Sequence, residues 1–422
     1  MTDVKPILAP LTSIRFLAAL HILLFHVSEG ERVPELSGQT PLFSLFRELP
    51  IWLMNILHRG YCSTSLFFLL SGVVLAYLYL DAAGRLTVAP REFLVARFVR
   101  LYPFHMAVLA LLAIIVLPLS LLGWLMNPEA VARATPLGTP PAFFGFEIPF
   151  PLYQLIGLVL NALLVQAWFP EYALSGNFAT WALSTVVFFY VMFPVVAPRA
   201  ARLTRPLQWA LLAVLPLVAL IPTLIYMKFA DPPAGLTVAS EFLFRCPLLW
   251  LPHFLMGILV TRVAGLTRHG GAPSTLSRRP SLGDAAAVLA LLAMAIPDAT
   301  WSEWLQLGEW RPNFLLRHGL LAPLFIVLTY DLARGRGLLA WALSASLLKT
   351  LGATSFSIFI LQPLFMLLAV GVALIPIPAW LRLALIVAVT AVVSWLADRY
   401  LDQPLSNWAR RRWRPATPSQ TA

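Results

Sequence analysis

The first long apolar segment of the chain, LTSIRFLAALHILLFHV from Leu11, carries three ionisable side chains: His21 on one helix face, and Arg15 and His26 together on another. A cation at membrane depth costs about 2.5–3.5 kcal/mol on insertion scales, so such residues usually face a protein interior and serve a function. Arg15 and His26 are 11 residues apart. That spacing is about three turns at 3.6 residues per turn, so both side chains share one helix face, about 16 Å apart along the axis.

An imidazole on such a face can act as a general base or as a nucleophile, and a guanidinium can stabilise negative charge as it develops. We expect Arg15 and His26 to point into one shared, solvent-reachable chamber. The alternative is a snorkelling arginine near the helix entry and a hydrogen-bonded structural histidine. For Arg15 alone the alternative is the better reading, and the pair on one face favours a function.

A second pair of cations, Arg97 and Arg100, occurs in the stretch ARFVRLYPF. The two arginines are three residues apart, so they share a helix face. Planar guanidinium groups bind phosphate through paired hydrogen bonds, so this pair could hold the phosphates of a nucleotide-containing donor such as an acyl-CoA. The spacing alone favours an ordinary cytoplasmic anchor, because such arginines flank most membrane spans.

Two later segments add polar but uncharged groups to apolar helices. Trp181, Ser184 and Tyr190 follow one another in GNFATWALSTVVFFYVMFP, where Trp181 occupies the place of an interfacial aromatic. Ser355 and Gln362 belong to a polar stripe in LGATSFSIFILQPLF. We expect these five residues to support the site rather than to carry its chemistry.

The elements that must position these residues are transmembrane helices. Of 422 residues, 59% are hydrophobic and 12% are charged, and the mean hydropathy is +0.80; soluble domains carry about 25% charged residues. The net charge of +11 comes from arginines in short connections and in the tail, a pattern that indicates membrane topology and not nucleic-acid binding. Two distant cysteines, Cys62 and Cys246, give neither a disulfide framework nor metal-ligand spacing.

Apolar length and arginine distribution predict an all-α polytopic protein with about ten spans and both termini cytoplasmic. The stretch after the first helix, HVSEGERV, has no small-residue cleavage site, so we expect that helix to be retained. An eleventh apolar run, 151–168, would give a number of crossings that disagrees with the arginine distribution if it spanned the membrane. It is therefore expected to be re-entrant or interfacial. One domain is expected over 1–405, followed by a basic cytoplasmic tail, 406–422, that is disordered. The expected spans lie near 11–28, 64–80, 103–125, 181–198, 207–228, 242–262, 283–297, 313–333, 353–374 and 380–399.

Taken in order, these features resemble the acyltransferase-3 family of integral membrane O-acyltransferases. The matching pieces are Arg15 with ten residues before His26, the SLFFLLSGVVLA helix, Arg97-x-x-Arg100 before Tyr102-Pro103, the block from Trp181 to Pro194, the LG-x-x-SFSIF run from Leu351, and Asp402-x-Pro404. The resemblance covers nearly the whole chain.

The resemblance implies a bacterial inner-membrane enzyme with no metal and no permanently bound cofactor. It would move an acyl group, often acetyl from acetyl-CoA, to a hydroxyl of a cell-surface polysaccharide or glycolipid. By the same resemblance, His26 is the catalytic imidazole and Arg15 is its motif partner. Arg97 and Arg100 would bind the acyl-CoA donor.

The chain departs from the family pattern at three positions. Val186 stands where the tryptophan block usually carries a Glu, Gln362 stands where a His is frequent, and Asp402 replaces a Glu. An imidazole base needs an orienting partner, so loss of that Glu opens a second reading: a catalytically impaired relative that acts as a transporter or as a lipid- or glycan-binding membrane protein. Donor binding without turnover, with activity restored by Val186→Glu, would favour that reading. A different acyl group, and direct transfer against an acyl-histidine intermediate, also stay open.

Overall fold

The chain folds as an assembly of helices, described here from a computed structural model over residues 9–29, 46, 48–126, 142–143, 146–229, 237–267, 276–305 and 311–413. Two strands of two residues each, β1 (Ala142–Phe143) and β2 (Phe146–Glu147), pair antiparallel. All other regular structure in the described residues is helical. The predicted all-α architecture is therefore confirmed.

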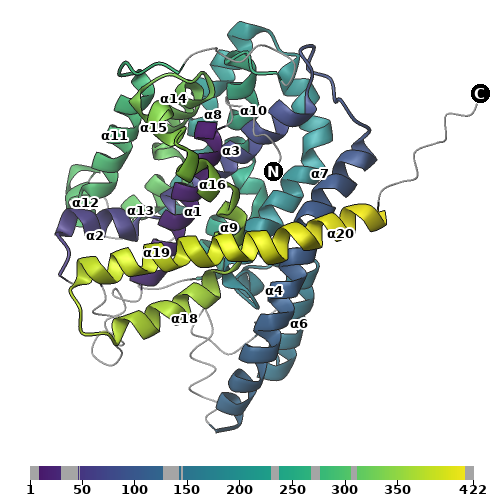
Figure 1. Ribbon diagram of the computed structural model, residues 1–422, viewed down its shortest axis with the longest axis vertical. Coiled ribbons are helices and arrows are strands. Elements are labelled where there is room, and N and C mark those ends of the chain that lie inside the picture. Colours follow the sequence, from purple (N-terminus) through teal and green to yellow (C-terminus); the bar gives the residue numbers. More distant parts are fainter. Residues whose placement is uncertain are drawn as a thin grey trace, which may run out of the picture.

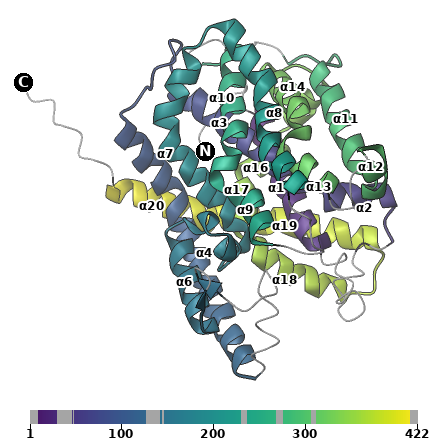
Figure 2. The same cartoon turned by 180° about the vertical axis from the view of Figure 1, so that it is seen from behind.

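Figures 1 and 2 show the helices as a broad body from which α4 and α6 project side by side. The α-helices are α1 (Ala9–Glu29), α2 (Ile51–His58), α3 (Cys62–Tyr79), α4 (Pro90–Met126), α6 (Phe150–Ala162), α7 (Trp181–Ala201), α8 (Arg205–Phe229), α9 (Val238–Arg245), α10 (Leu251–Val263), α11 (Leu282–Ala295), α12 (Asp298–Leu305), α13 (Arg311–Leu315), α14 (Ala322–Ala333), α15 (Leu338–Leu343), α16 (Ser346–Ala353), α17 (Ser355–Ile360), α18 (Gln362–Ala373), α19 (Ala379–Ala397) and α20 (Gln403–Trp413). Short 3-10 turns are η4 (Gln166–Trp168), η5 (Pro170–Tyr172), η6 (Phe178–Thr180) and η7 (Pro247–Trp250), and π-helical turns are η8 (Leu316–Leu320) and η9 (Asp398–Asp402).

The described residues contain six helices that are long and apolar enough to cross a bilayer, or up to nine if each bent pair of helices forms one span. The pairs bend by 42° between α9 and η7–α10, by 97° between α11 and α12, and by 41° between the helix that ends at η8 and α14. The predicted span 353–374 is broken into α17 and α18, neither of which reaches 18 residues. The described part of the chain therefore contains six to nine candidate spans, and the expected count of about ten stays a prediction.

The apolar run 151–168 forms the 13-residue helix α6 and then the short turn η4. A straight span needs about 20 residues, so α6 is too short to cross alone. Its assignment as re-entrant or interfacial stays a prediction. At the other end of the chain, α20 enters the segment expected to be tail, and residues 414–422 lie outside the described part.

The first helix, α1, runs through the interior and packs against α3, α16 and α17. Small residues allow its neighbours to approach closely. A methyl group added at Gly60 would overlap the carbonyl oxygen of His21 on α1, and one added at Gly72 would overlap that of Phe254 on α10. Helices pack through small residues in lipid because the bilayer supplies no hydrophobic driving force between them. The Gly60 contact brings the connection between α2 and α3 against α1, and the Gly72 contact brings α3 against α10.

Candidate active site

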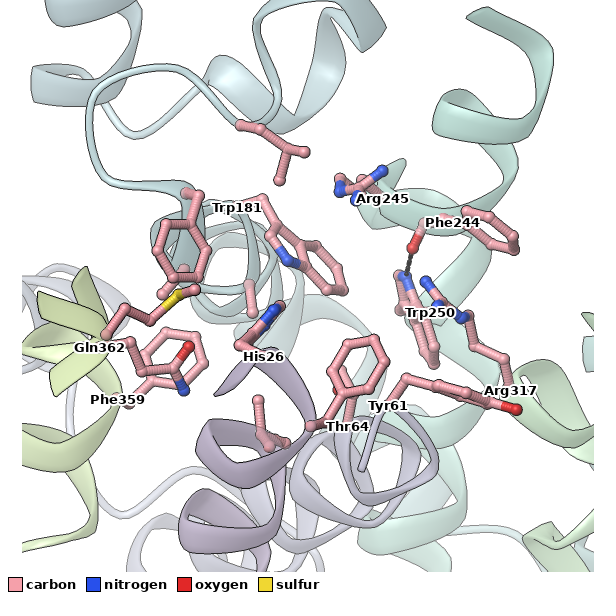
Figure 3. Close-up of a pocket in the computed structure, with 17 residues that line it drawn as sticks. His26, Tyr61, Thr64, Trp181, Phe244, Arg245, Trp250, Arg317, Phe359 and Gln362 are labelled. Atoms are coloured by element: carbon pink, nitrogen blue, oxygen red, sulfur yellow. Dashed lines mark hydrogen bonds between the residues drawn. The ribbon is translucent and has the colours of Figure 1, made fainter. Parts of the chain in front are cut away.

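His26 lines a cavity of about 480 Å³, hereafter the histidine cavity. Figure 3 shows the imidazole near its centre, below the indole of Trp181. The ring of His26 contacts the ring of Phe178 edge-on at 4.9 Å between centroids and that of Phe25 at 4.8 Å. The cavity is lined by Ile22, Phe25, His26, Tyr61, Thr64, Leu174, Phe178, Ala179, Trp181, Ala182, Phe244, Arg245, Trp250, Arg317, Phe359, Gln362 and Met366.

Arg15 lines a second cavity of about 200 Å³, hereafter the arginine cavity. Arg97 and Arg100 line the same cavity, so three guanidinium groups from α1 and α4 meet in one small volume. The remaining lining residues are Thr12, Phe67, Ser71, Leu101, Ala182, Leu183, Val186, Tyr190, Gly352, Ala353, Ser355, Phe356 and Phe359.

The two cavities share two wall residues, Ala182 on α7 and Phe359 on α17. The expectation that Arg15 and His26 open into one chamber is therefore wrong. The helix face was assigned correctly, since both side chains of α1 reach cavities that adjoin each other. Because the residues lie about 16 Å apart along the axis, side chains of α7 and α17 fit between them and divide the space.

The three arginines of the arginine cavity are held in different ways. Arg15 lies over the ring of Phe67, at 5.3 Å from the centroid, and its buried Nε has no hydrogen-bond partner in the described residues. Arg97 lies over the ring of Tyr79 at 4.8 Å and donates to that tyrosine's hydroxyl. Stacking of this kind fixes the plane of a guanidinium while its N–H edge stays available for an anion.

Arg100 forms an ion pair with Asp402, the acidic residue of the C-terminal motif. Its Nη1 lies 2.5 and 2.7 Å from the two carboxylate oxygens, and Asp402 is fully buried. Ser406 on α20 donates to the carbonyl oxygen of Arg100 at 3.2 Å. Two sequence motifs about 300 residues apart thus meet at the mouth of the arginine cavity, and Asp402 positions Arg100 there.

The five expected supporting residues divide between the cavities. Trp181 and Gln362 line the histidine cavity, and Tyr190 and Ser355 line the arginine cavity. Ser184 is buried, lines neither cavity, and its hydroxyl has no hydrogen-bond partner in the described residues. Gln362 is also fully buried, and neither atom of its amide is paired in the part of the chain that the structure describes. Figure 3 shows that amide pointing into the cavity.

Val186, the residue at the usual Glu position, lines the arginine cavity and not the histidine cavity. The concern from the sequence was that loss of a carboxylate here leaves His26 without an orienting partner. A carboxylate at this position would instead lie in the cavity of Arg15, Arg97 and Arg100. Relative to the family pattern, Val186 therefore removes a negative charge from the arginine cavity and not from the histidine cavity.

Sequence reasoning did not assign several residues of the histidine cavity, above all Arg245, Arg317, Tyr61 and Trp250. For Arg317 the sequence contained a signal, since this residue belongs to the predicted span 313–333. An arginine inside an apolar span is a candidate functional residue. Tyr61 donates from its hydroxyl to Oδ1 of Asn313 at 2.5 Å. Burial raises the pKa of the Tyr61 phenol above its ordinary value, so the group is a neutral donor.

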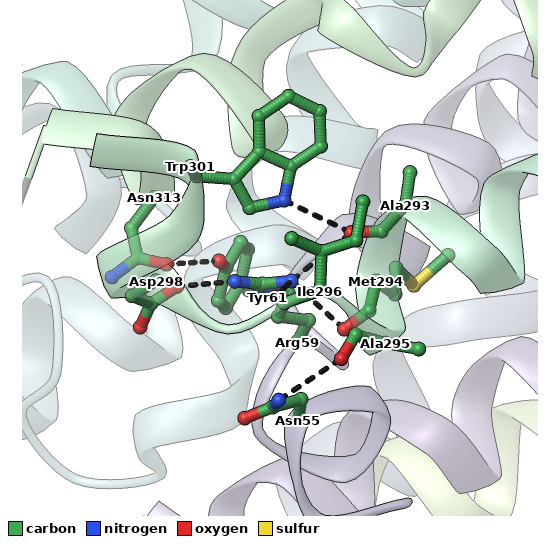
Figure 4. Close-up of polar contacts among 10 residues, drawn as sticks. All are labelled: Asn55, Arg59, Tyr61, Ala293, Met294, Ala295, Ile296, Asp298, Trp301 and Asn313. Carbon is green, nitrogen blue, oxygen red and sulfur yellow. Dashed lines mark hydrogen bonds and ion pairs between the residues drawn. The ribbon is translucent and has the colours of Figure 1, made fainter. Parts of the chain in front are cut away.

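A buried polar network surrounds Arg59, close to Tyr61 of the histidine cavity (Figure 4). Arg59, 1% exposed, donates to the carbonyl oxygens of Met294 at 2.8 Å and Ile296 at 2.5 Å, and forms an ion pair with Asp298. The C-terminal carbonyls of a helix have no partners within it. Arg59 supplies partners for those of α11 and so fixes the 97° bend to α12.

Replacement of Arg59 by methionine should lower the stability of the protein by about 3 kcal/mol, since breaking a buried ion pair leaves its partners unsatisfied. Denaturant unfolding of the purified protein in detergent, followed by tryptophan fluorescence, measures the change. Arg279→Met, at an exposed position, is the control and should unfold as the wild type does. Equal midpoints for the two variants would show that the network does not stabilise the bend.

The fold and the site define a class: an all-helical protein with several candidate membrane spans and a buried imidazole in a cavity beside a cluster of arginines. The profile of the family Acyl_transf_3, described as an acyltransferase domain, matches residues 10–399. The chain belongs to this acyltransferase family.

Two curated relatives are similar to parts of the chain. The acyltransferase MdmB of Streptomyces mycarofaciens is 26% identical over 280 residues, which are 64% of this chain and 61% of that protein. Protein 2 in the picA locus of Rhizobium radiobacter is 32% identical over 155 residues, 34% of this chain and 78% of that protein. The chain thus spans about three fifths of the length of MdmB. No solved structure matches it significantly.

Proposed function

We propose that the protein transfers an acyl group, acetyl in the simplest case, from an acyl-CoA to a hydroxyl of a cell-surface polysaccharide or glycolipid. The observation that carries the proposal is the arrangement along α1. Three guanidiniums meet in one cavity, His26 lines the next, and only Ala182 and Phe359 are common to both walls. Membership of the acyltransferase family supports the reaction class.

In this proposal the donor's phosphates bind in the arginine cavity. Arginine binds phosphate through two parallel N–H···O bonds, which are shorter and stronger than neutral ones. Arg97 and Arg100 lie on the part of α4 that the arginine distribution predicts to be cytoplasmic. Arg15, which was expected to be the partner of His26, is here assigned as a third donor-binding group. Asp402 lowers the net charge of the cluster and holds Arg100 in place.

The thioester of the donor then extends past Ala182 and Phe359 into the histidine cavity. His26 takes the proton of the acceptor hydroxyl as its oxygen attacks the thioester carbonyl. The acyl–sulfur bond breaks, the new ester bond forms on the acceptor, and the proton passes from the imidazolium to the leaving thiolate. Attack by the imidazole itself, followed by transfer to the hydroxyl, uses the same residues and also balances. The amide of Gln362 is positioned to donate to the carbonyl oxygen as negative charge develops on it.

The proposal is tested with purified protein in proteoliposomes and acetyl-labelled acetyl-CoA. Release of free CoA, together with label in an oligosaccharide or glycolipid fraction, is the expected result. Labelled donor that binds to the protein and is recovered intact, across a panel of hydroxyl acceptors and water, would contradict it.

The second candidate function is the transport or binding of lipids or glycans by a catalytically impaired member of the family. Val186 is the observation that favours it. Val186→Glu separates the two. If the arginine cavity holds donor phosphates in an active enzyme, a carboxylate there should raise the KM for acetyl-CoA about tenfold or more, because like charges are placed together. If the wild type is impaired by loss of the Glu, the same variant should gain turnover. Val187→Glu, one position along α7 and not in that cavity's wall, is the matched control.

A further inference from the structure

Two guanidiniums line the histidine cavity, and the reaction with acyl-CoA gives them no role. Arg245 ends α9 and Arg317 lies in the π-helical turn η8. Both are part of the cavity wall that also contains His26. Charged groups inside a membrane protein are costly and are usually retained for a substrate or ion pathway.

Aromatic rings fix both arginines. The guanidinium carbon of Arg317 lies 4.0 Å from the ring centroid of Phe244 and 4.6 Å from that of Tyr61. Arg245 lies 6.0 Å from the ring of Trp181 and forms an ion pair with the buried Glu241. A guanidinium stacked in this way has its plane set in advance and loses little entropy when its N–H edge binds a planar anion.

The rest of the cavity is suited to a cyclic polar ligand. Trp181 and Trp250 present indole faces, and Trp250 is held by its own hydrogen bond to the carbonyl oxygen of Phe244 at 3.0 Å. The unpaired amide of Gln362 lies toward the opposite end of the cavity from Arg317, with His26 between them (Figure 3). An acceptor bound here can place a hydroxyl at His26, polar groups at Gln362 and a further group at the arginines.

We propose that the acceptor carries an anionic group, a carboxylate or a phosphate, which binds Arg317 and Arg245 while a nearby hydroxyl faces His26. This inference rests on the proposed function, since it names the substrate class of the same site. Arg317 lies closer to its aromatic rings than Arg245 does, so it is the position that the test replaces. Charge-assisted hydrogen bonds of this kind correspond to about 10- to 100-fold in affinity.

The test compares glucose derivatives that are neutral at C6 with derivatives that carry an anionic group there. Binding of methyl glucoside, methyl glucuronide and glucose 6-phosphate to the purified full-length protein is measured by saturation-transfer NMR, without donor, at low ionic strength. We expect the glucuronide or the phosphate to bind at least tenfold more tightly than the neutral glucoside. The stronger of the two identifies the anion as carboxylate or phosphate.

Arg317→Gln should remove most of that preference, and Arg317→Lys should retain part of it. Arg334→Gln is the matched control, since Arg334 bonds the carbonyl oxygen of Ala264 and lines neither cavity. Equal binding of the three ligands, or a charge preference unchanged in Arg317→Gln, would overturn the inference. Release of CoA from acetyl-CoA by the wild type is measured in parallel, so failure of the acyltransferase proposal is distinguished from failure of this one.

Discussion

Replacement of His26 by alanine is expected to lower the rate of acyl transfer by about 10²–10⁴-fold, the range that a positioned general acid–base contributes. His26→Asn should give the same loss, because the amide keeps a polar group of similar size but cannot accept the hydroxyl proton. Turnover of labelled acetyl-CoA by protein in proteoliposomes measures both. Donor affinity should change little, since the arginine cavity lies beyond Ala182 and Phe359.

The matched control for His26 is His21 on the same helix. Its Nδ1 lies 2.8 Å from the hydroxyl oxygen of Ser63 and its Nε2 lies 2.7 Å from the carbonyl oxygen of Ile56. These bonds join α1 to α2 and α3, so His21→Gln should weaken the packing and keep the turnover of folded protein. A variant of His26 with full activity, or equal losses at His21 and His26, would remove the catalytic assignment.

Loss of Arg15 and Arg97 together should raise the KM for acetyl-CoA by about 10²–10⁴-fold. Each charge-assisted bond to phosphate is worth about 1.5–3 kcal/mol, and 1.4 kcal/mol is a factor of ten. The kcat should fall less, because neither residue lines the cavity of His26. Glutamine replaces both arginines in the variant, because it keeps a polar side chain at each position and removes the charge.

Acetyl-pantetheine, which lacks the nucleotide and its phosphates, provides the decisive comparison for the arginine cavity. The double variant should use this truncated donor about as well as the wild type does. Arg91→Gln, at an exposed position on the same helix as Arg97, is the control and should leave the ratio between the two donors unchanged. An equal loss with both donors would show that Arg15 and Arg97 support the fold and do not bind phosphate.

Local periodicity was sufficient to predict part of the site. The spacing of Arg15 and His26 placed both on one face of α1, and hydropathy placed most of the long helices. The wall between their cavities could not be predicted, since Ala182 and Phe359 come from helices far along the chain. The same is true of the ion pair between Arg100 and Asp402, which depends on how α4 packs against η9 and α20.

Helix continuity was the least predictable feature. The stretch 353–374 has the apolar length of a span, but the structure divides it into α17 and α18. The break after α17 brings Gln362 into the histidine cavity while Ser355 reaches the arginine cavity. Arg317 lies in a π-helical turn, beside Gly319 with its φ of 161°. Such breaks depend on which neighbouring groups satisfy the freed backbone, and a single sequence does not contain that information.

The most direct test of the two-cavity arrangement is a cryo-EM structure of the protein with a non-hydrolysable thioether analogue of acetyl-CoA. We expect the phosphates of the analogue to lie against Arg15, Arg97 and Arg100, and its pantetheine arm to lie between Ala182 and Phe359. The acetyl-bearing end should lie within reach of His26. An analogue bound with its phosphates elsewhere, or with its arm outside the junction of the two cavities, would contradict the account.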